Sequence, residues 1–140
     1  MKISAILQDD VEQVWSLIHN YMEGAAKYTH GRFTADDIKR CFIKNHNQQL
    51  WIAYDDNKIY GAAITEVMQY PQMKVLTMHF TGGVEFSKWH KEIISIFRSF
   101  AKDTGCQTIE AFGRPGWKKI FEKDGFKSNF IFFELPVEKE

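Results

Sequence analysis

The sequence predicts a single α/β domain in which helices cover a mixed sheet. Two stretches, residues 9–24 and 87–103, carry apolar side chains at helical spacing. Between and after them lie shorter apolar runs that end at glycine, proline or Asp-Asp-Asn turns, which is typical of strands. Because the chain of 140 residues contains no repeat and no flexible linker, we expect residues 1–140 to form one domain.

The first half of the chain is predicted to hold a strand, two helices and a hairpin. Asp9 followed by Glu12 suggests a capping box at the start of the first helix. Thr34 is expected to cap the second helix, which the acidic residues of its first turn also favour. That helix should bury Ile38, Cys41 and Phe42. The predicted ranges are 1–7 for the strand, 9–24 for the first helix, and 49–54 and 59–70 for the hairpin.

The second half adds a third strand of the meander, a long helix, a strand, a short helix and a last strand. Their predicted ranges are 73–80, 87–103, 108–112, 117–123 and 126–137. The order is therefore β-α-α-β-β-β-α-β-α-β. A helix between strands 73–80 and 108–112 implies that these two are parallel, whereas the hairpins imply antiparallel pairs. Alternation should place His79 on the face of Val75 and Thr77, with Phe80 on the opposite face.

Charge and composition exclude several classes of protein. The 18 basic and 18 acidic residues give no net charge, which argues against a nucleic-acid binder, since such proteins need a basic face. No apolar run is long enough for a membrane span or a signal peptide, so we expect a cytoplasmic protein with no membrane partner. Cys41 and Cys106 form no paired motif and are interpreted as buried apolar residues. The histidines lack metal-ligand spacing, and we predict no metal site.

The element order, with LWIAYDDNKIYGAAIT as the central hairpin, resembles the GNAT superfamily of N-acetyltransferases. The most specific segment is IFEKDGF. GNAT enzymes have a short helix that ends in Tyr, then three residues, then Gly-Phe, and here Phe121 and the pair Gly125-Phe126 occupy those places. The resemblance covers nearly the whole chain in architecture. It implies a mixed sheet and, for an active enzyme, transfer of an acetyl group from acetyl-CoA to an amine.

Two departures from the GNAT pattern concern the cofactor. The family loop Q/R-x-x-G-x-G/A, whose amides bind the pyrophosphate of acetyl-CoA, is replaced by TGGVEFSKW, in which Glu85 would repel a phosphate. Phe121 stands where the family often has a tyrosine acid, and it has no proton to give. Acetyl-CoA binding is therefore predicted to be weak or absent. If the cofactor does bind, the resemblance implies contacts from Phe80, Thr81, Gly82, Gly83, Val84 and Arg114.

Each of these residues also has a purely structural interpretation. Gly82 and Gly83 equally suit a plain turn from a strand into a helix, and Arg114 equally suits an anchor for the turn that contains Pro115. Three residues are candidates for the general base of an active enzyme, namely His79, Glu66 and Glu110. The alternative for each is an ordinary polar residue of a half-exposed sheet.

The combination of the hairpin with HFTGG and GRPGWKKIFEKDGF is also similar to small GNAT-like proteins of tailed bacteriophages and prophages. That resemblance implies a protein partner in virion assembly and a location in the cytoplasm of the bacterial host. Two hypotheses follow: a binding scaffold with a degenerate acetyl-CoA site, which the altered loop and Phe121 favour, or an active N-acetyltransferase. Self-association of identical copies is compatible with both.

Overall fold

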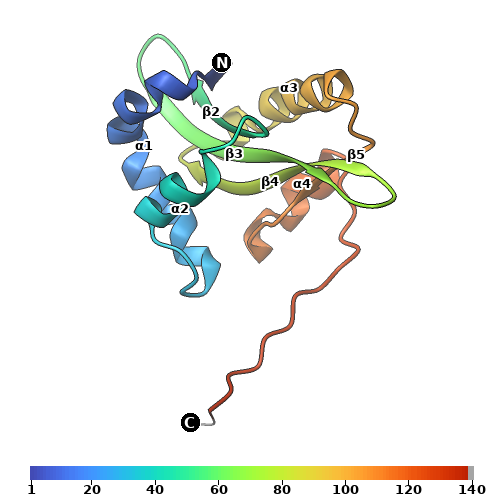
Figure 1. Ribbon diagram of the computed structural model, residues 1–140. Helices are drawn as coiled ribbons and strands as arrows, with labels where there is room; N and C mark the ends of the chain where they lie inside the picture. The colour runs from blue at the N-terminus through green and yellow to red at the C-terminus, as the bar shows by residue number, and fades with distance from the viewer. Residues whose placement is uncertain (139–140) are drawn as a thin grey trace.

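One mixed sheet forms the centre of the molecule in the computed structural model, which describes residues 1–138 (Figure 1). Its five strands lie in the order of the sequence, and their bounds are β1 Lys2–Ile6, β2 Gln48–Tyr54, β3 Ile59–Gln69, β4 Lys74–Gly83 and β5 Thr108–Ala111. Neighbours from β1 to β4 are antiparallel, and β4 and β5 are parallel. The predicted parallel pair is therefore confirmed, with the long helix connecting its two strands.

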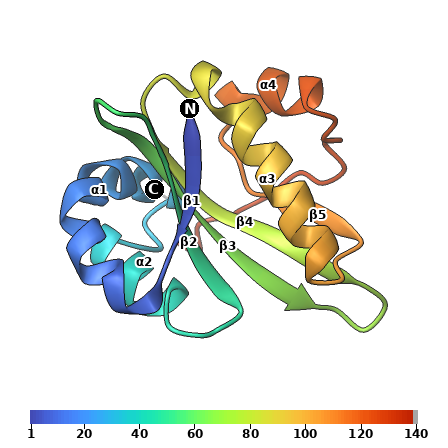
Figure 2. The ribbon, with the colours of Figure 1, turned by 90° about the horizontal axis from the view of Figure 1, so that it is seen from above.

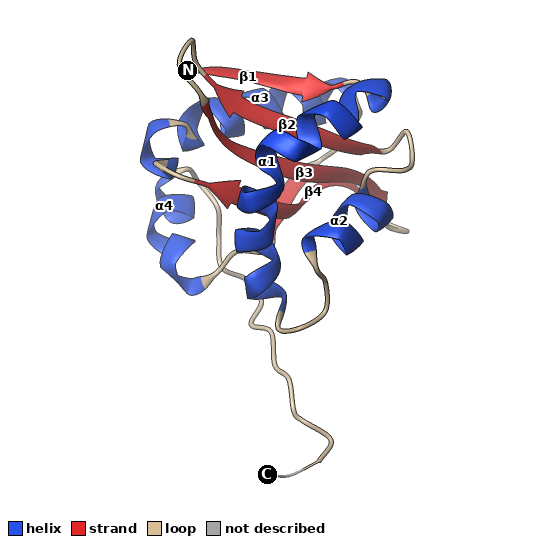
Figure 3. Ribbon diagram, turned by 90° about the vertical axis from the view of Figure 1, so that its left-hand side faces the viewer, coloured by secondary structure: helices blue, strands red, loops and turns tan. Residues whose placement is uncertain are grey.

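Helices cover both faces of the sheet (Figure 2). The helices are α1 Val11–Ala26, α2 Ala35–Phe42, α3 His90–Asp103 and α4 Lys118–Lys123. Figure 3 shows α1 and α2 lying across one face, and Figure 2 shows α3 and α4 on the other. Short 3₁₀ turns precede or follow several of these helices, including Phe86–Lys88 before α3 and Pro115–Trp117 before α4. The mixed α/β class predicted from the sequence is confirmed.

Each face of the sheet has its own apolar core. Trp15 and Ile18 of α1 are buried beneath that helix, and Ile94 and Phe97 of α3 are buried on the opposite face together with Phe121 of α4. Residues three, four and seven apart share one side of a helix, so the apolar spacing of α1 and α3 places these side chains against the sheet. Large rings contribute to both layers: Trp51, Trp89 and Phe97 lie in the one under α3, and Trp15 and Phe80 lie in the one under α1.

The two N-terminal helices begin differently. Thr34 caps α2 as predicted: its hydroxyl accepts a hydrogen bond from the N–H of Asp37, and the carboxylate of Asp37 accepts one from the N–H of Thr34. The capping box expected at Asp9 does not form. A 3₁₀ turn, Gln8–Asp10, occupies that place, and α1 begins only at Val11 without a side-chain cap.

The predicted last strand, residues 126–137, is not part of the sheet. The chain leaves α4 and runs away from the body in an extended path (Figure 1). Phe130, Phe133 and Leu135 are almost fully exposed there. Aromatic and branched residues favour extended backbone, but a strand also needs a neighbour to accept and donate its hydrogen bonds, and composition does not supply that neighbour.

The two cysteines differ from expectation in burial. Cys41 is exposed on α2, since the inner stripe of that short helix is made by Ala35 and Ile38, and Cys106 is only half-buried. His90, in the first turn of α3, is buried because α4 packs beside it and Asp124, directly after that helix, is its partner. Within residues 1–138, no helix combines the length and the apolar character that crossing a bilayer requires.

Candidate functional site

The candidate site begins where β4 and β5 separate. The two strands pair from Val75 opposite Thr108 to Met78 opposite Ala111. β4 then continues to Gly83, whereas the chain after β5 turns away toward α4. One edge of β4, from His79 to Gly83, therefore has no strand partner among the described residues, while β3 pairs with the other edge. Backbone amides and carbonyls along such an edge are free to bind an extended ligand.

A β-bulge at His79 sets the side chains at this edge. Ile64 of β3 lies opposite Phe80 and Thr65 lies opposite Met78, so His79 is the extra residue. A bulge turns two consecutive side chains toward the same face. The ring of Phe42 in α2 lies 4.8 Å from the ring of His79 and 4.9 Å from that of Phe80, between centroids. The expectation that Phe80 lies on the face opposite His79 is therefore wrong.

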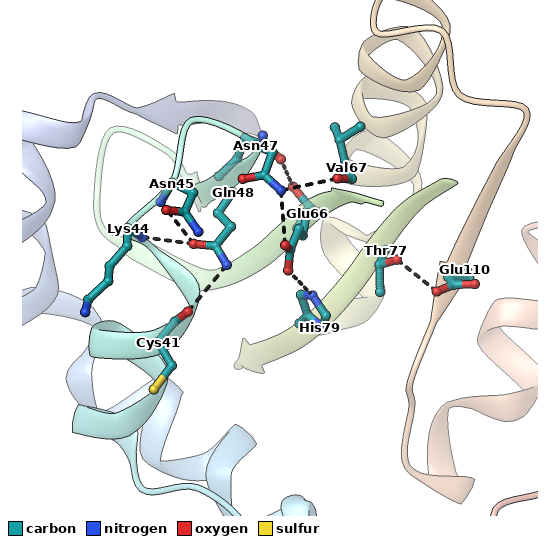
Figure 4. Close-up of polar contacts among 12 residues, drawn as sticks. Cys41, Lys44, Asn45, Asn47, Gln48, Glu66, Val67, Thr77, His79 and Glu110 are labelled. Atoms are coloured by element: carbon teal, nitrogen blue, oxygen red, sulfur yellow. Dashed lines mark hydrogen bonds and ion pairs between the residues drawn. The ribbon is translucent and has the colours of Figure 1, made fainter. Parts of the chain in front are cut away.

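His79 forms a polar pair with Glu66 of β3 (Figure 4). Its Nε2 lies 2.8 Å from Oε1 of the carboxylate, and both side chains are only 16% exposed. Asn47, just before β2, donates from Nδ2 to the other carboxylate oxygen at 3.1 Å. When Nε2 carries the imidazole hydrogen it donates to Glu66, and Nδ1 then keeps a lone pair that can accept a proton.

Glu110 lies on the same face, one strand further along. Thr77 of β4 is opposite Glu66 on β3 and opposite Glu110 on β5, so the three side chains stand in one row across the sheet. The carboxylate of Glu110 accepts hydrogen bonds from the hydroxyls of Thr77, at 2.9 Å, and Tyr70, at 2.8 Å. The bond to Glu110 raises the pKa of the Tyr70 phenol. All three candidate bases predicted from the sequence are thus brought to one sheet face.

A hollow of about 220 Å³ lies at the far end of β4. It is lined by Asn20, Tyr21, Gly24 and Ala25 of α1 and by Thr81, Gly82, Gly83, Val84 and Arg114. Five of the six residues that the resemblance implied for the cofactor therefore line one hollow. The sixth, Phe80, lies in the core beneath α1 and α2 and is 8% exposed.

The two glycines of this hollow are required by protein packing. A Cβ at Gly82 would collide with the carbonyl oxygen of Tyr21, where α1 crosses β4. Gly83 has a positive φ of 150°, and a Cβ there would collide with the carbonyl oxygen of Tyr60. The N–H of Val84 donates to that same carbonyl at 2.8 Å. These contacts account for both glycines without a phosphate.

Arg114 lies in a stack of rings between the two helical layers. Its guanidinium carbon is 4.5 Å from the ring centre of Tyr28 and 4.4 Å from that of Trp117. Phe86 also stacks on Trp117, with centroids 4.8 Å apart and planes 19° from parallel. Among residues 1–138, no carboxylate lies within ion-pair distance of Arg114. Its charge is therefore available to an anion.

The acidic loop residue that was expected to repel a phosphate is paired. Glu85 contacts the ammonium groups of Lys88 at 2.7 Å and Lys58 at 3.1 Å. The hydrogen bond from Lys88, followed by that from Lys58, lowers the pKa of the Glu85 carboxyl. The negative charge of Glu85 is thus offset by two lysines, so Glu85 is not an unpaired carboxylate in this loop.

Phe121 is a core residue and offers no acid. Its ring is 9% exposed and lies against Trp117, at 5.8 Å between centroids, and Phe126, at 4.9 Å. No group of three or more potential metal ligands occurs within residues 1–138.

Four residues of the site escaped sequence reasoning, namely Phe42, Asn47, Tyr70 and Thr77. Thr77 could have been found from its position opposite Glu66 on β3 and Glu110 on β5. That register can be worked out only when the position of the bulge is known.

Comparison with known proteins supports the architecture. No family model matches the chain, and no curated protein does. Among solved structures, an aminoglycoside acetyltransferase from an uncultured soil metagenomic sample superposes with a TM-score of 0.71 at 13% identity, covering 98% of this chain and 96% of that one. A ribosomal-protein-alanine N-acetyltransferase from Brucella melitensis gives 0.69 at 12% identity, with 98% and 100% covered. Glucosamine-6-phosphate N-acetyltransferase from Arabidopsis thaliana gives 0.65 at 15% identity, with 98% of each covered.

At identities this low the superpositions show a similar backbone arrangement and nothing more. That similarity extends over almost the full length of each chain. In this chain the arrangement consists of the antiparallel strands β1 to β4, the parallel pair of β4 and β5, and helices on both faces. The chain has the fold of the GNAT acetyltransferases.

Proposed function

We propose that this protein transfers an acetyl group from acetyl-CoA to an amine. The observation that carries the proposal is the His79–Glu66 pair. It lies at the bulge of β4, beside the stretch from His79 to Gly83 whose outer edge has no strand partner among residues 1–138, and it is only partly exposed. A basic group at this place can act on a substrate bound along the edge.

The pair suits the proton transfer that acetylation of an amine requires. An alkylammonium ion is not a nucleophile, so it must lose a proton before it attacks a carbonyl. Nδ1 of His79 can accept that proton when Nε2–H is bonded to Glu66. The carboxylate then stabilises the imidazolium, and Asn47 holds the carboxylate in place through its amide. Glu110, already bonded to two hydroxyls, is less free to act as the base.

The residues present fit acetyl-CoA at two points. The free edge of β4 offers backbone groups to the amides of an extended pantetheine arm. Arg114, which lines the hollow and has no carboxylate partner within residues 1–138, offers positive charge to the phosphates. When bound, the cofactor supplies the acetyl group as a thioester. With Phe121 in place of a tyrosine, no side chain at that position protonates the thiolate, and a thiolate of ordinary pKa can leave without help.

A scaffold without acetyl transfer is the second candidate. The packing of Gly82 and Gly83 against Tyr21 and Tyr60 favours it, because those glycines then need no phosphate to explain them. The N–H of Val84 is also already used by a carbonyl. In this alternative the GNAT fold presents a surface to a protein partner, such as a component of virion assembly, in the host cytoplasm.

Calorimetric titration with acetyl-CoA separates the two candidates, together with a free-thiol assay over a panel of amines. The first candidate expects saturable binding and thiol release that depends on an amine. His79→Ala and Glu66→Gln should each lower kcat by about 10²–10⁴-fold, the usual worth of a general base. His46→Ala, an exposed histidine in the loop before β2, is the matched control and should leave kcat unchanged.

Two further variants test the residues proposed to bind the phosphates of the cofactor. Arg114→Ala should weaken acetyl-CoA binding, and Glu85→Gln should strengthen it, because the latter frees two lysines. Absence of binding at millimolar acetyl-CoA, in protein that circular dichroism shows to be folded, would refute the enzyme and leave the scaffold.

A further inference from the structure

A carboxylate without a cation lies on the same sheet face as the His79–Glu66 pair. Glu110 of β5 is half-buried, and within residues 1–138 no lysine, arginine or histidine lies within ion-pair distance of it. Glu66, by contrast, already has His79 and Asn47 as partners. A carboxylate that is partly removed from water and has no opposite charge beside it is stabilised when a cation binds to it.

Two hydroxyls hold this carboxylate in one orientation. Thr77 donates to Oε2 at 2.9 Å, and Tyr70 donates to the same oxygen at 2.8 Å. Oε1 accepts no hydrogen bond from residues 1–138, and Figure 4 shows it pointing away from Thr77. Tyr70 also places an aromatic ring beside the carboxylate, and the faces of such rings attract ammonium groups. Glu110 is therefore oriented, with one oxygen left to bind a ligand.

The spacing of the strands sets how far this oxygen lies from the reacting amine. Glu66, Thr77 and Glu110 stand opposite one another on β3, β4 and β5. His79 belongs to the middle strand of the three. Adjacent strands are about 4.8 Å apart, so an amine at the His79 ring and a cation at Glu110 are separated by roughly 5–10 Å. An alkyl chain of a few carbons covers that distance.

We infer that the acceptor is a short diamine, whose second ammonium group binds Glu110. The inference rests on the acetyl transfer proposed above and names the substrate class of the same site. One ammonium group gives its proton to Nδ1 of His79 and receives the acetyl group, while the other keeps its proton and pairs with Glu110. A monoamine of the same length leaves Glu110 without a cation, so Glu110 determines the specificity for the acceptor.

Calorimetric titration with two probes, diaminobutane and butylamine, tests the second ammonium site without acetyl-CoA. Diaminobutane should bind about tenfold more tightly than butylamine, which has the same carbon chain but a single charge. Glu110→Gln keeps the shape of the side chain and should remove that difference. Glu92→Gln, at an exposed position of α3 on the opposite face of the sheet, removes the same charge and should preserve the difference.

Two further measurements locate the contact and assign its role. The NMR signals of the Tyr70 ring should shift with diaminobutane and stay in place with butylamine, because the Tyr70 hydroxyl is bonded to Glu110. In the thiol-release assay, Glu110→Gln should raise the KM for diaminobutane about tenfold. It should leave kcat for diaminobutane, and both constants for butylamine, nearly unchanged. Using the same two amines with both proteins cancels the difference in the basicity of the amines themselves.

The outcomes separate this inference from the proposed function. Thiol release with both amines at equal KM, and no tighter binding of diaminobutane, would overturn the diamine and leave acetyl transfer standing. A preference for diaminobutane that Glu110→Gln does not reduce would overturn the diamine site at Glu110 as well. Binding of diaminobutane that depends on Glu110, without thiol release with any amine, would refute acetyl transfer and uphold the ammonium site.

Discussion

His90, in the first turn of α3, and Asp124, directly after α4, are joined by a contact of 2.7 Å between Nδ1 and Oδ2. The two side chains are only 11% and 6% exposed. The contact fastens the two helices that cover one face of the sheet to each other at their ends.

Asp124→Ala should lower the free energy of unfolding by about 1–3 kcal/mol, because it leaves a buried imidazole nitrogen without its partner. Urea titration followed by circular dichroism measures the change. Glu122→Ala, at an exposed position of the same helix, is the control and should change stability by less than about 0.5 kcal/mol. Equal effects from both would mean that the pair contributes nothing beyond the helix itself.

Gly82→Ala should destabilise the protein by about 1–3 kcal/mol, since the new methyl group forces α1 and β4 apart. The matched change is Gly24→Ala, in the body of α1, where an added Cβ meets nothing within 4 Å. That change should stabilise by about 0.5–1 kcal/mol, because alanine favours a helix more than glycine does. Thermal unfolding of the two variants side by side gives opposite shifts, and shifts of the same sign would contradict the packing described for α1.

Phe97→Ala should cost about 3–5 kcal/mol, as for other fully buried aromatic residues. Phe97 is fully buried between α3 and the sheet, where its ring lies 5.2 Å from that of Trp51. Ile96→Ala, next to it but 38% exposed, should cost far less. Denaturant titration decides the matter, and a loss below about 1 kcal/mol for Phe97→Ala would be incompatible with this core.

Tyr70 should ionise at higher pH than an unfolded tyrosine, because its hydroxyl donates to the carboxylate of Glu110. A pKa raised by folding means that the protonated phenol is favoured in the folded state. The resulting stability is complete below the pKa of an unfolded tyrosine and is lost as pH rises through the folded-state pKa. NMR titration of labelled tyrosines measures the pKa, with Tyr70→Phe to assign the signal. In Glu110→Gln the Tyr70 pKa should fall, and an unchanged value would show that Glu110 is not its cause.

Much of the fold could be predicted from the sequence, because the side chains that a helix or strand buries recur at a regular spacing. The apolar spacing of residues 9–24 and 87–103 predicted the two long helices that are observed as α1 and α3, and the helix between two strands implied a parallel pair. Residues 126–137 have the composition of a strand, but they pair with no strand within the described residues 1–138. Local composition shows that a segment favours an extended backbone. Whether a neighbouring strand is in place to form hydrogen bonds with it depends on how the whole sheet assembles.

The sequence identified several residues of the site but not how their side chains are arranged. His79, Glu66 and Glu110 were candidates because of their chemistry, and their common face follows from strand register. The bulge that turns Phe80 to the face of Phe42 breaks the alternation on which a strand assignment relies. Likewise, the sequence shows the charge of Glu85 but cannot show that Lys58, 27 residues earlier, lies beside it.

The position of Arg114 between Tyr28 and Trp117 has a consequence for ligand entropy. A free arginine side chain samples many rotamers, and ordering it costs about 1.5–2 kcal/mol. In this protein the two rings restrict the guanidinium during folding, before any ligand arrives. An anion that reaches the hollow therefore meets a cation that is already oriented, and most of the ordering cost is not incurred a second time on binding.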